Sequence, residues 1–148
     1  MDRKVRFLAV ISLSILTVLC LVGCAEEQKE AELEVVDSDF SIREADEGSF
    51  VVDAKGVIKN VGQVDVKEVE VTGYCRSCGE EVIDGQWFES DYEKMEHQKD
   101  VISHLSAGSE EEFEFEEVAF CMMHKSQERP KELPENLEVS IESYEIAE

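Results

Sequence analysis

Two cysteine-containing clusters carry the clearest chemical signal in this chain. Cys75 and Cys78 are separated by two residues and followed by Gly79, and Cys121 and His124 repeat the same spacing further along. Three thiols and one imidazole, grouped two and two, form the ligand set of a closed tetrahedral zinc site. Because four protein ligands leave no position open for water or substrate, the spacing predicts a structural zinc rather than a catalytic one.

Copper is the second metal that these residues suit. The spacing of Cys121 and His124 resembles the ligand loop of blue-copper proteins, and Met122 and Met123 are thioethers between them. That family also needs a histidine on an earlier strand and a methionine after the histidine. No histidine precedes His97, and no methionine follows His124. Zinc is therefore expected rather than copper.

The N-terminal segment determines the compartment, and hence the oxidation state of the thiols. Arg3 and Lys4 precede an apolar run of 16 residues at positions 7–22, and polar residues begin abruptly after Cys24. A basic start, a short apolar core and small residues before a cut are typical of a secretory signal peptide. An uncleaved transmembrane anchor is the alternative, but the run is shorter than the roughly 20 residues that span a bilayer.

The tetrapeptide Leu-Val-Gly-Cys at residues 21–24 resembles the lipobox of prokaryotic lipoproteins. The resemblance implies removal of residues 1–23 and a lipid on the sulfur of Cys24. The lipid would anchor the chain to the cell membrane on its extracytoplasmic side. Residues 24–32 are charged and lack bulky apolar side chains, so they are expected to be a spacer. Residues 33–148 are expected to form one domain with one core.

A disulfide is the main alternative to zinc, because an extracytoplasmic compartment is oxidising. Once the signal peptide is removed and Cys24 is lipidated, three thiols remain, so pairing leaves one of them free. A bond between Cys75 and Cys78 closes a small loop of a kind that is more often redox-active than structural. A bridge from Cys121 to either of them would join two strands. Zinc alone uses all three thiols and accounts for His124.

Composition restricts the class of partner. The chain has 14 basic and 36 acidic residues, a formal net charge of −22. Loss of three basic residues and one acidic residue with the signal peptide makes this −24. Such a charge argues against nucleic acid and anionic lipid headgroups as partners. Cations and basic proteins suit it better, although solubility alone also explains an acidic surface.

Apolar and polar residues alternate along most of the mature chain, which is the period of β-strands rather than helices. Turn signals containing glycine or proline separate the alternating segments. Only residues 89–100 suggest a helix, or else a charged loop. The pattern predicts an all-β protein, an antiparallel β-sandwich of six to seven strands. The alternating segments are residues 33–35, 40–42, 50–58, 69–73, 113–115 and 137–141.

Several short motifs follow one another in a recognisable order. They are Asn60-Val-Gly62, a strand ending at Tyr74, Leu105-Ser-Ala-Gly108, and Phe113-Glu-Phe115. This order resembles the FxLYD domain, an immunoglobulin-like sandwich common on prokaryotic surface lipoproteins, over about residues 50–118. The resemblance implies fold and location, and neither catalysis nor metal binding. The chain departs from the family where Cys75 stands in place of its usual aspartate, and where residues 82–105 form a longer segment.

The departures coincide with the cysteine clusters. In a sandwich of this kind, the turn after the third strand and the connection after Phe120 lie at the same end. This placement assumes that residues 82–105 cross the sandwich once. If they contain two antiparallel strands, the clusters are expected at opposite ends and the metal site cannot form.

Two functions remain open at this stage. One is a non-enzymatic interaction or envelope module on the cell surface, with Cys75, Cys78, Cys121 and His124 holding a structural zinc in place of missing core area. The other is an extracytoplasmic thiol-redox or metal-handling protein in which Cys75 and Cys78 cycle between dithiol and disulfide or pass on zinc or copper. The redox alternative lacks the helix N-terminus that lowers the thiol pKa in thioredoxin-like motifs.

Overall fold

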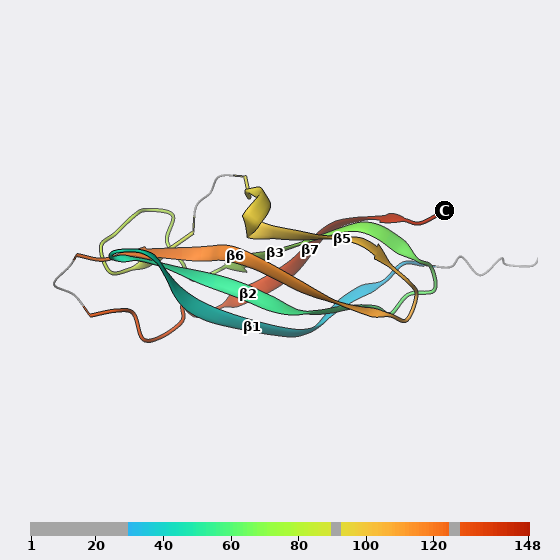
Figure 1. Ribbon diagram of the computed structural model, residues 1–148, viewed down its shortest axis with the longest axis horizontal. Coiled ribbons are helices and arrows are strands. Elements are labelled where there is room, and N and C mark those ends of the chain that lie inside the picture. Colours follow the sequence, from blue (N-terminus) through green and yellow to red (C-terminus); the bar gives the residue numbers. More distant parts are fainter. Residues whose placement is uncertain (1–29, 90–92, 125–127) are drawn as a thin grey trace, which may run out of the picture.

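Seven strands form an antiparallel β-sandwich in the described part of the chain (Figure 1). The structure is a computed structural model and describes residues 30–89, 93–124 and 128–148. One sheet has the order β1-β2-β6-β4 and the other the order β5-β3-β7. This confirms the predicted all-β sandwich. The strands are β1 (Leu33–Asp46), β2 (Ser49–Asn60), β3 (Val66–Cys75), β4 (Trp87–Phe88), β5 (Lys99–Leu105), β6 (Glu110–Met122) and β7 (Leu137–Ile146), and one 3-10 turn, η1, spans Glu96–Gln98.

The predicted signal peptide and Cys24 lie outside the described residues. Strand β1 begins at Leu33, the residue at which the domain was predicted to start. The end of the predicted spacer already contacts the domain, because the carbonyl oxygens of Glu30 and Glu32 accept hydrogen bonds from the N–H groups of Gln63 and Val61, at 2.9 and 2.8 Å. Among the described residues, no helix is long and apolar enough to cross a membrane.

The first two alternating segments form one long strand instead of two. Strand β1 pairs with β2 along its length, and the register shifts between Val35 and Asp37. Such a bulge moves the inward-facing positions by one residue. The shift explains why the sequence pattern broke after Val35 and started again at Phe40.

The two sheets pack closely because Gly73 on β3 has no side chain. A Cβ atom added there would lie 2.8 Å from Phe115 Cε2 and 2.8 Å from Val118 Cγ2, both on β6. The rings of Phe113 and Phe115 stack with their centroids 5.6 Å apart. Burying these apolar groups supplies the main driving force of folding. The fully or almost fully buried core residues are Val52, Ala54, Ile58, Val66, Val69, Val71, Cys75, Leu105, Phe113, Phe115, Val118 and Ala119.

A second bulge, at Glu117, interrupts the alternation of inward-facing and outward-facing residues along β6. The register of β6 against β2 shifts between Val52 and Ala54, and Glu117 has a φ of 62°. The side chain of Asp53 stabilises this conformation, because its Oδ1 accepts a hydrogen bond from the N–H of Glu117 at 3.1 Å. Both Phe115 before the bulge and Val118 after it therefore reach Gly73 on the opposite sheet.

The segment between β3 and β6 contains two strands and yet crosses the sandwich only once. Strand β4 has two residues, and it stays at the end where β3 finishes, because Gly79 forms a bridge to Phe88. Strand β5 then runs antiparallel to β3, from beside Thr72 to beside Val66, toward the opposite end of the sandwich. The expectation that residues 82–105 cross the sandwich once is therefore confirmed, and both clusters lie at one end.

Candidate functional site at the disulfide end

The first cysteine cluster forms a disulfide between Cys75 and Cys78. Cys75 is the last residue of β3 and is 3% exposed within the core, whereas Cys78 lies in the following turn and is half-buried. The disulfide is thus one of the outcomes that the sequence left open. The two cysteines differ in burial: Cys75 belongs to the core, and Cys78 packs against the core while remaining partly exposed.

The second cluster lies at the same end but does not join the disulfide. Cys121 pairs in register with Phe50 on β2 and Trp87 on β4, is 1% exposed, and is a free thiol. Burial raises the pKa of the Cys121 thiol, and the negative charge of Asp84 raises it further. His124 is exposed, and its N–H donates to Asp84 Oδ1 at 3.0 Å.

The four residues predicted to bind zinc are therefore at one end of the sandwich without forming a ligand set. No group of three or more His, Cys, Asp or Glu side chains within the described ranges is arranged to hold a metal ion. Zinc ligation requires thiolates, whereas Cys75 and Cys78 are joined and the thiol of Cys121 resists ionisation. The zinc site stays a prediction for the reduced chain.

The turn that carries the disulfide is held by backbone hydrogen bonds of its own. The N–H of Cys78 donates to the carbonyl of Cys75 at 3.2 Å, and that of Arg76 to Asn136 at 3.0 Å. The N–H of Gly79 donates to the carbonyl of Trp87 at 3.3 Å. The conformation of Gly79 does not require glycine, because its φ is not positive and an added Cβ would find no atom closer than 4.0 Å.

The disulfide contributes little to stability compared with the bridge that the fold did not form. Closing a loop as short as that between Cys75 and Cys78 stabilises a chain by about 2 kcal/mol in the loop-entropy description. Bridging Cys75 to Cys121 would contribute about 4 kcal/mol in the same description. The disulfide that forms is therefore the one that stabilises the fold less, and it does not link the two sheets.

A cleft of about 600 Å³ opens beside the disulfide. Its floor is the outer face of β3, and its lining includes both disulfide cysteines. Five carboxylates and three cations surround it, so its net charge is negative. Each cation is paired with a glutamate, Arg76 with Glu138, Lys94 with Glu89, and Lys99 with Glu70. The charged residues that line the cleft are Glu70, Arg76, Glu80, Glu89, Glu93, Lys94, Lys99 and Glu142.

Tyr74 provides the aromatic surface of the cleft. The guanidinium carbon of Arg76 lies 4.4 Å from the ring centroid, and the ammonium nitrogen of Lys94 lies 4.8 Å from it. Such cation–π contacts stabilise the cations next to the ring. Burial raises the pKa of the Tyr74 hydroxyl, and the carboxylate of Glu142 raises it further, so the phenol is neutral at physiological pH.

Glu89 connects the cleft to the buried cysteine. Its Oε2 accepts a hydrogen bond from the N–H of Cys75 at 2.6 Å, and its Oε1 forms an ion pair with Lys94 at 2.6 Å. Both side chains are largely buried, with 18% and 15% of their surface exposed. A hydrogen bond to a charged acceptor is stronger than a neutral one, so Glu89 fixes the end of β3. Nothing in the sequence around Glu89 or Lys94 indicated this role, since it depends on how residues 79–89 and 93–98 fold back on β3.

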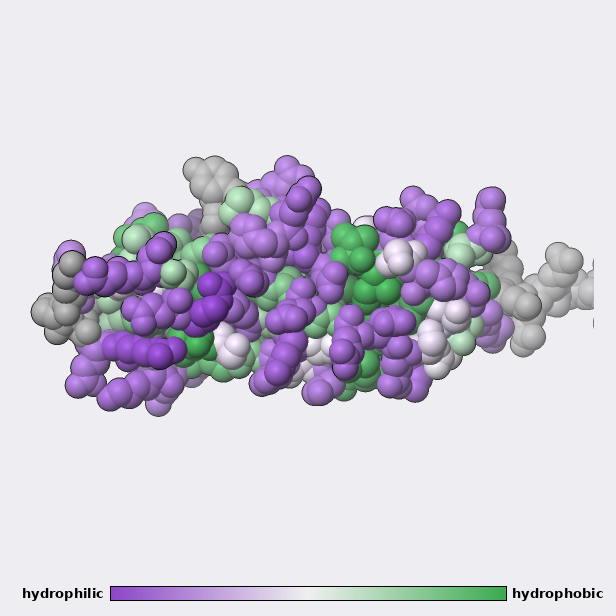
Figure 2. Space-filling model, viewed as in Figure 1, coloured by the Kyte–Doolittle hydropathy of each residue, from purple (hydrophilic) through white to green (hydrophobic). Residues whose placement is uncertain are grey.

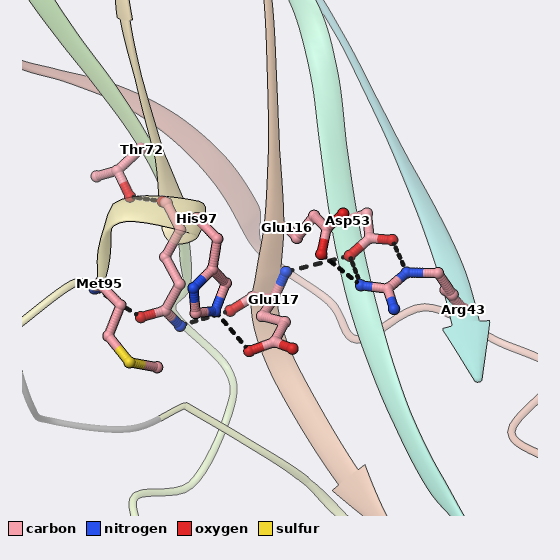
Figure 3. A network of polar contacts seen from close by, with 8 residues as sticks. Arg43, Asp53, Thr72, Met95, His97, Glu116 and Glu117 are labelled. Atoms are coloured by element: carbon pink, nitrogen blue, oxygen red, sulfur yellow. Dashed lines mark hydrogen bonds and ion pairs between the residues drawn. The ribbon is translucent and has the colours of Figure 1, made fainter. Parts of the chain in front are cut away.

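Glu93 and Lys94 form one wall of the cleft. The residues that follow them, up to Gln98, are fastened on two sides (Figure 3). On the β3 side, the hydroxyl of Thr72 donates to the carbonyl of Gln98 at 2.6 Å. On the β6 side, Nε2 of Gln98 donates to the carbonyl of Glu117 at 2.9 Å, and His97 Nε2 lies 2.8 Å from Glu117 Oε2. The bulge at Glu117 thus serves as the anchor of this wall.

The anchor is itself supported by side chains from β1 and β2, which belong to the same sheet as β6. Figure 3 shows Arg43 and Asp53 on the far side of β6 from His97. The guanidinium of Arg43 contacts both carboxylate oxygens of Asp53, at 2.5 and 3.1 Å, and also Glu116 at 3.0 Å. A continuous polar network therefore runs from β1 through β2 and β6 to η1 and β3.

The native intact mass of residues 25–148, purified without chelator, distinguishes the two states of the cysteines. We expect a mass about 2 Da below that of the fully reduced chain, the difference made by one disulfide. Cys121 should react with an alkylating reagent only after unfolding, because it is buried and its pKa is raised. A mass about 63 Da above the reduced chain, lost in acid, would instead establish zinc held with release of two protons.

No family model matches the chain, and neither the comparison with curated proteins nor that with solved structures gave a match.

Proposed function

We propose that the protein is a non-enzymatic, lipid-anchored module that stands on the extracytoplasmic side of the cell membrane and binds a protein partner through its disulfide end. The signal-peptide pattern and the lipobox-like residues before Cys24 support the anchor. The resemblance to the FxLYD domain supports an immunoglobulin-like surface module. The fold fits this orientation, because the start of β1 lies at the end of the sandwich opposite the loops that follow β3 and β6 (Figure 1).

Exposed apolar side chains at the disulfide end are the observation that carries the proposal. Val82 and Ile83 are 61% and 45% exposed in the loop after the disulfide, and Met122 is 48% exposed at the end of β6. The loop and the strand are joined by a hydrogen bond from Gly85 N–H to the carbonyl of Met122 at 2.7 Å. Figure 2 shows hydrophilic residues over most of the face in view, with hydrophobic areas both at this end, on the left, and right of the centre. Exposed apolar side chains gathered at one end of a domain are typical of interaction sites.

A photoreactive residue placed at Val82 tests this interaction surface in cells that carry the anchored chain. We expect irradiation to join the protein to a defined partner, seen as a discrete band of higher mass. Val61 is the matched control, because it is also an exposed valine, 40% exposed, and contacts Glu32 at the opposite end. Adducts that are the same from both positions, or absent from Val82, would contradict a binding site at the disulfide end.

The anchor is tested separately in the same cells. The Cys24→Ser variant is expected to take up no label from a fatty acid supplied to the cells, since the lipid is attached to that sulfur in the proposal. Equal labelling of this variant and the parent would contradict lipidation of Cys24 and leave the result at Val82 unaffected.

A further inference from the structure

We propose that the Cys75–Cys78 disulfide is a thiol-exchange site, at which the thiol of a basic protein segment attacks Sγ of Cys78. This goes beyond the proposed binding function, which needs only a rigid disulfide end. Four features of the site carry the inference: the unequal burial of the two cysteines, the cleft beside them, the independent support of the turn, and the charge of the cleft.

Unequal burial determines which sulfur is attacked. Cys75 is 3% exposed in the core, and its N–H is held by Glu89. Cys78 is half-buried in a turn whose neighbours Ser77 and Gly79 are exposed. Thiol–disulfide exchange requires the attacking sulfur to approach the bond that it breaks. Cys78 is the more accessible of the two, so attack is expected there.

The exchange proceeds in balanced steps. A partner thiolate attacks Sγ of Cys78, a new S–S bond forms there, and the Cys75–Cys78 bond breaks. Its electron pair stays on Cys75, which takes a proton from solvent. A second thiol of the partner then attacks the mixed disulfide and releases Cys78. The partner is oxidised to a disulfide, and this protein is reduced to a dithiol.

The turn is built to keep its shape in both redox states. Three backbone hydrogen bonds, donated by Arg76, Cys78 and Gly79, hold it without help from the sulfurs. Cys75 is also fixed by its place in β3, paired with Leu137 on β7. Reduction therefore removes one short covalent loop and leaves the surrounding pairing in place.

Charge determines which thiols are preferred. The cleft beside Cys78 is lined by five carboxylates and three cations, and each cation is already paired with a glutamate. The whole chain carries a formal net charge of −22. A positively charged thiol is drawn toward such a site and an anionic one is repelled, an effect that added salt screens. The partner thiol is therefore expected to be flanked by lysine or arginine.

Small thiols of opposite charge test the site on the folded protein. The wild-type domain is incubated with cysteamine or with mercaptopropionate, compared at equal thiolate concentration, and then quenched in acid, alkylated and mapped by mass spectrometry. We expect the mixed disulfide on Cys78, the alkyl group on Cys75, and a rate for cysteamine about tenfold higher at low salt, falling toward equality at high salt. A disulfide that resists both thiols while the domain stays folded, or an adduct on Cys75, would overturn the proposal.

Variants separate exchange at Cys78 from general thiol reactivity. Cys75→Ala leaves Cys78 free, and this variant should be modified by cystamine, whereas Cys78→Ala should be modified slowly because Cys75 is in the core. Cys121→Ala keeps the Cys75–Cys78 disulfide and is the matched control. It should react with cysteamine at the same rate as the wild type. If Cys75→Ala does not fold, the mapping on the wild-type protein still decides the outcome. The result is independent of the crosslinking at Val82, so either proposal can fail without the other.

Discussion

Replacing Gly56 with alanine is expected to destabilise the domain by about 3 kcal/mol, close to the upper range for overpacking a single site. Gly56 lies on β2 and pairs with Ser38 of β1, close to the bulge between Val35 and Asp37. An added Cβ would lie 2.6 Å from Phe113 Cζ, and it would lie still closer to the carbonyl oxygen of Asp37. The ring has limited room because it is packed in the core, and the carbonyl belongs to the backbone of the neighbouring strand. Strands β1 and β2 must therefore separate locally.

Thermal unfolding of Gly56→Ala measures this effect, with a midpoint expected roughly 10 °C below that of the wild type. Gly79→Ala is the matched control, because the nearest atom to an added Cβ there would be 4.0 Å away and the backbone φ is not positive. The control should melt like the parent. Equal midpoints for Gly56→Ala and the parent would show that β1 does not press against Gly56 in solution.

Replacing Asn60 with alanine is expected to cost about 2 to 3 kcal/mol, because it leaves buried backbone groups without partners. Asn60 is completely buried at the end of β2. Its Nδ2 donates to the carbonyls of Val64 and Leu105 at 2.8 and 3.1 Å, and its Oδ1 accepts from the N–H of Gly62 at 3.1 Å. One side chain thus closes the turn after β2 and joins it to the end of β5.

Chemical denaturation can compare this variant with two others. Asn60→Asp should be at least as destabilising at neutral pH, because a carboxylate has no N–H to donate and becomes a buried charge. Gln63→Ala lies in the same turn, and its side chain is exposed, so it should be nearly neutral. A stability of Asn60→Asp close to the wild type would contradict the donor role of Nδ2.

The structural role of Asn60 shows why much of the fold was predictable from the sequence. The Asn60-Val-Gly62 motif and the Leu105-Ser-Ala-Gly108 motif are local rules, and the structure places turns at both. Gly108 has a φ of 79°, which favours glycine. Alternation likewise identified the strands that have one buried face. It missed β5, since residues 99–105 alternate weakly and pair only along one side.

Irregular features were less predictable because they depend on contacts distant in sequence. The bulge at Glu117 requires Asp53 from another strand, and the helix suggested at residues 89–100 is, among the described residues of that stretch, only the short turn η1. The cysteine clusters were correctly placed at one end, because the connection from β3 to β6 crosses the sandwich once, as the prediction assumed. Zinc and disulfide use the same residues at the same spacing, so the sequence could not choose between them.

The length of the strands has a mechanical consequence for a protein anchored in this orientation. Strand β2 has 12 residues, and at about 3.3 Å per residue the sandwich is roughly 40 Å long. In the proposed anchored orientation, the disulfide end would stand about one further membrane thickness away from the headgroups. A partner embedded in the same lipid leaflet would then need an ectodomain of similar height to reach it.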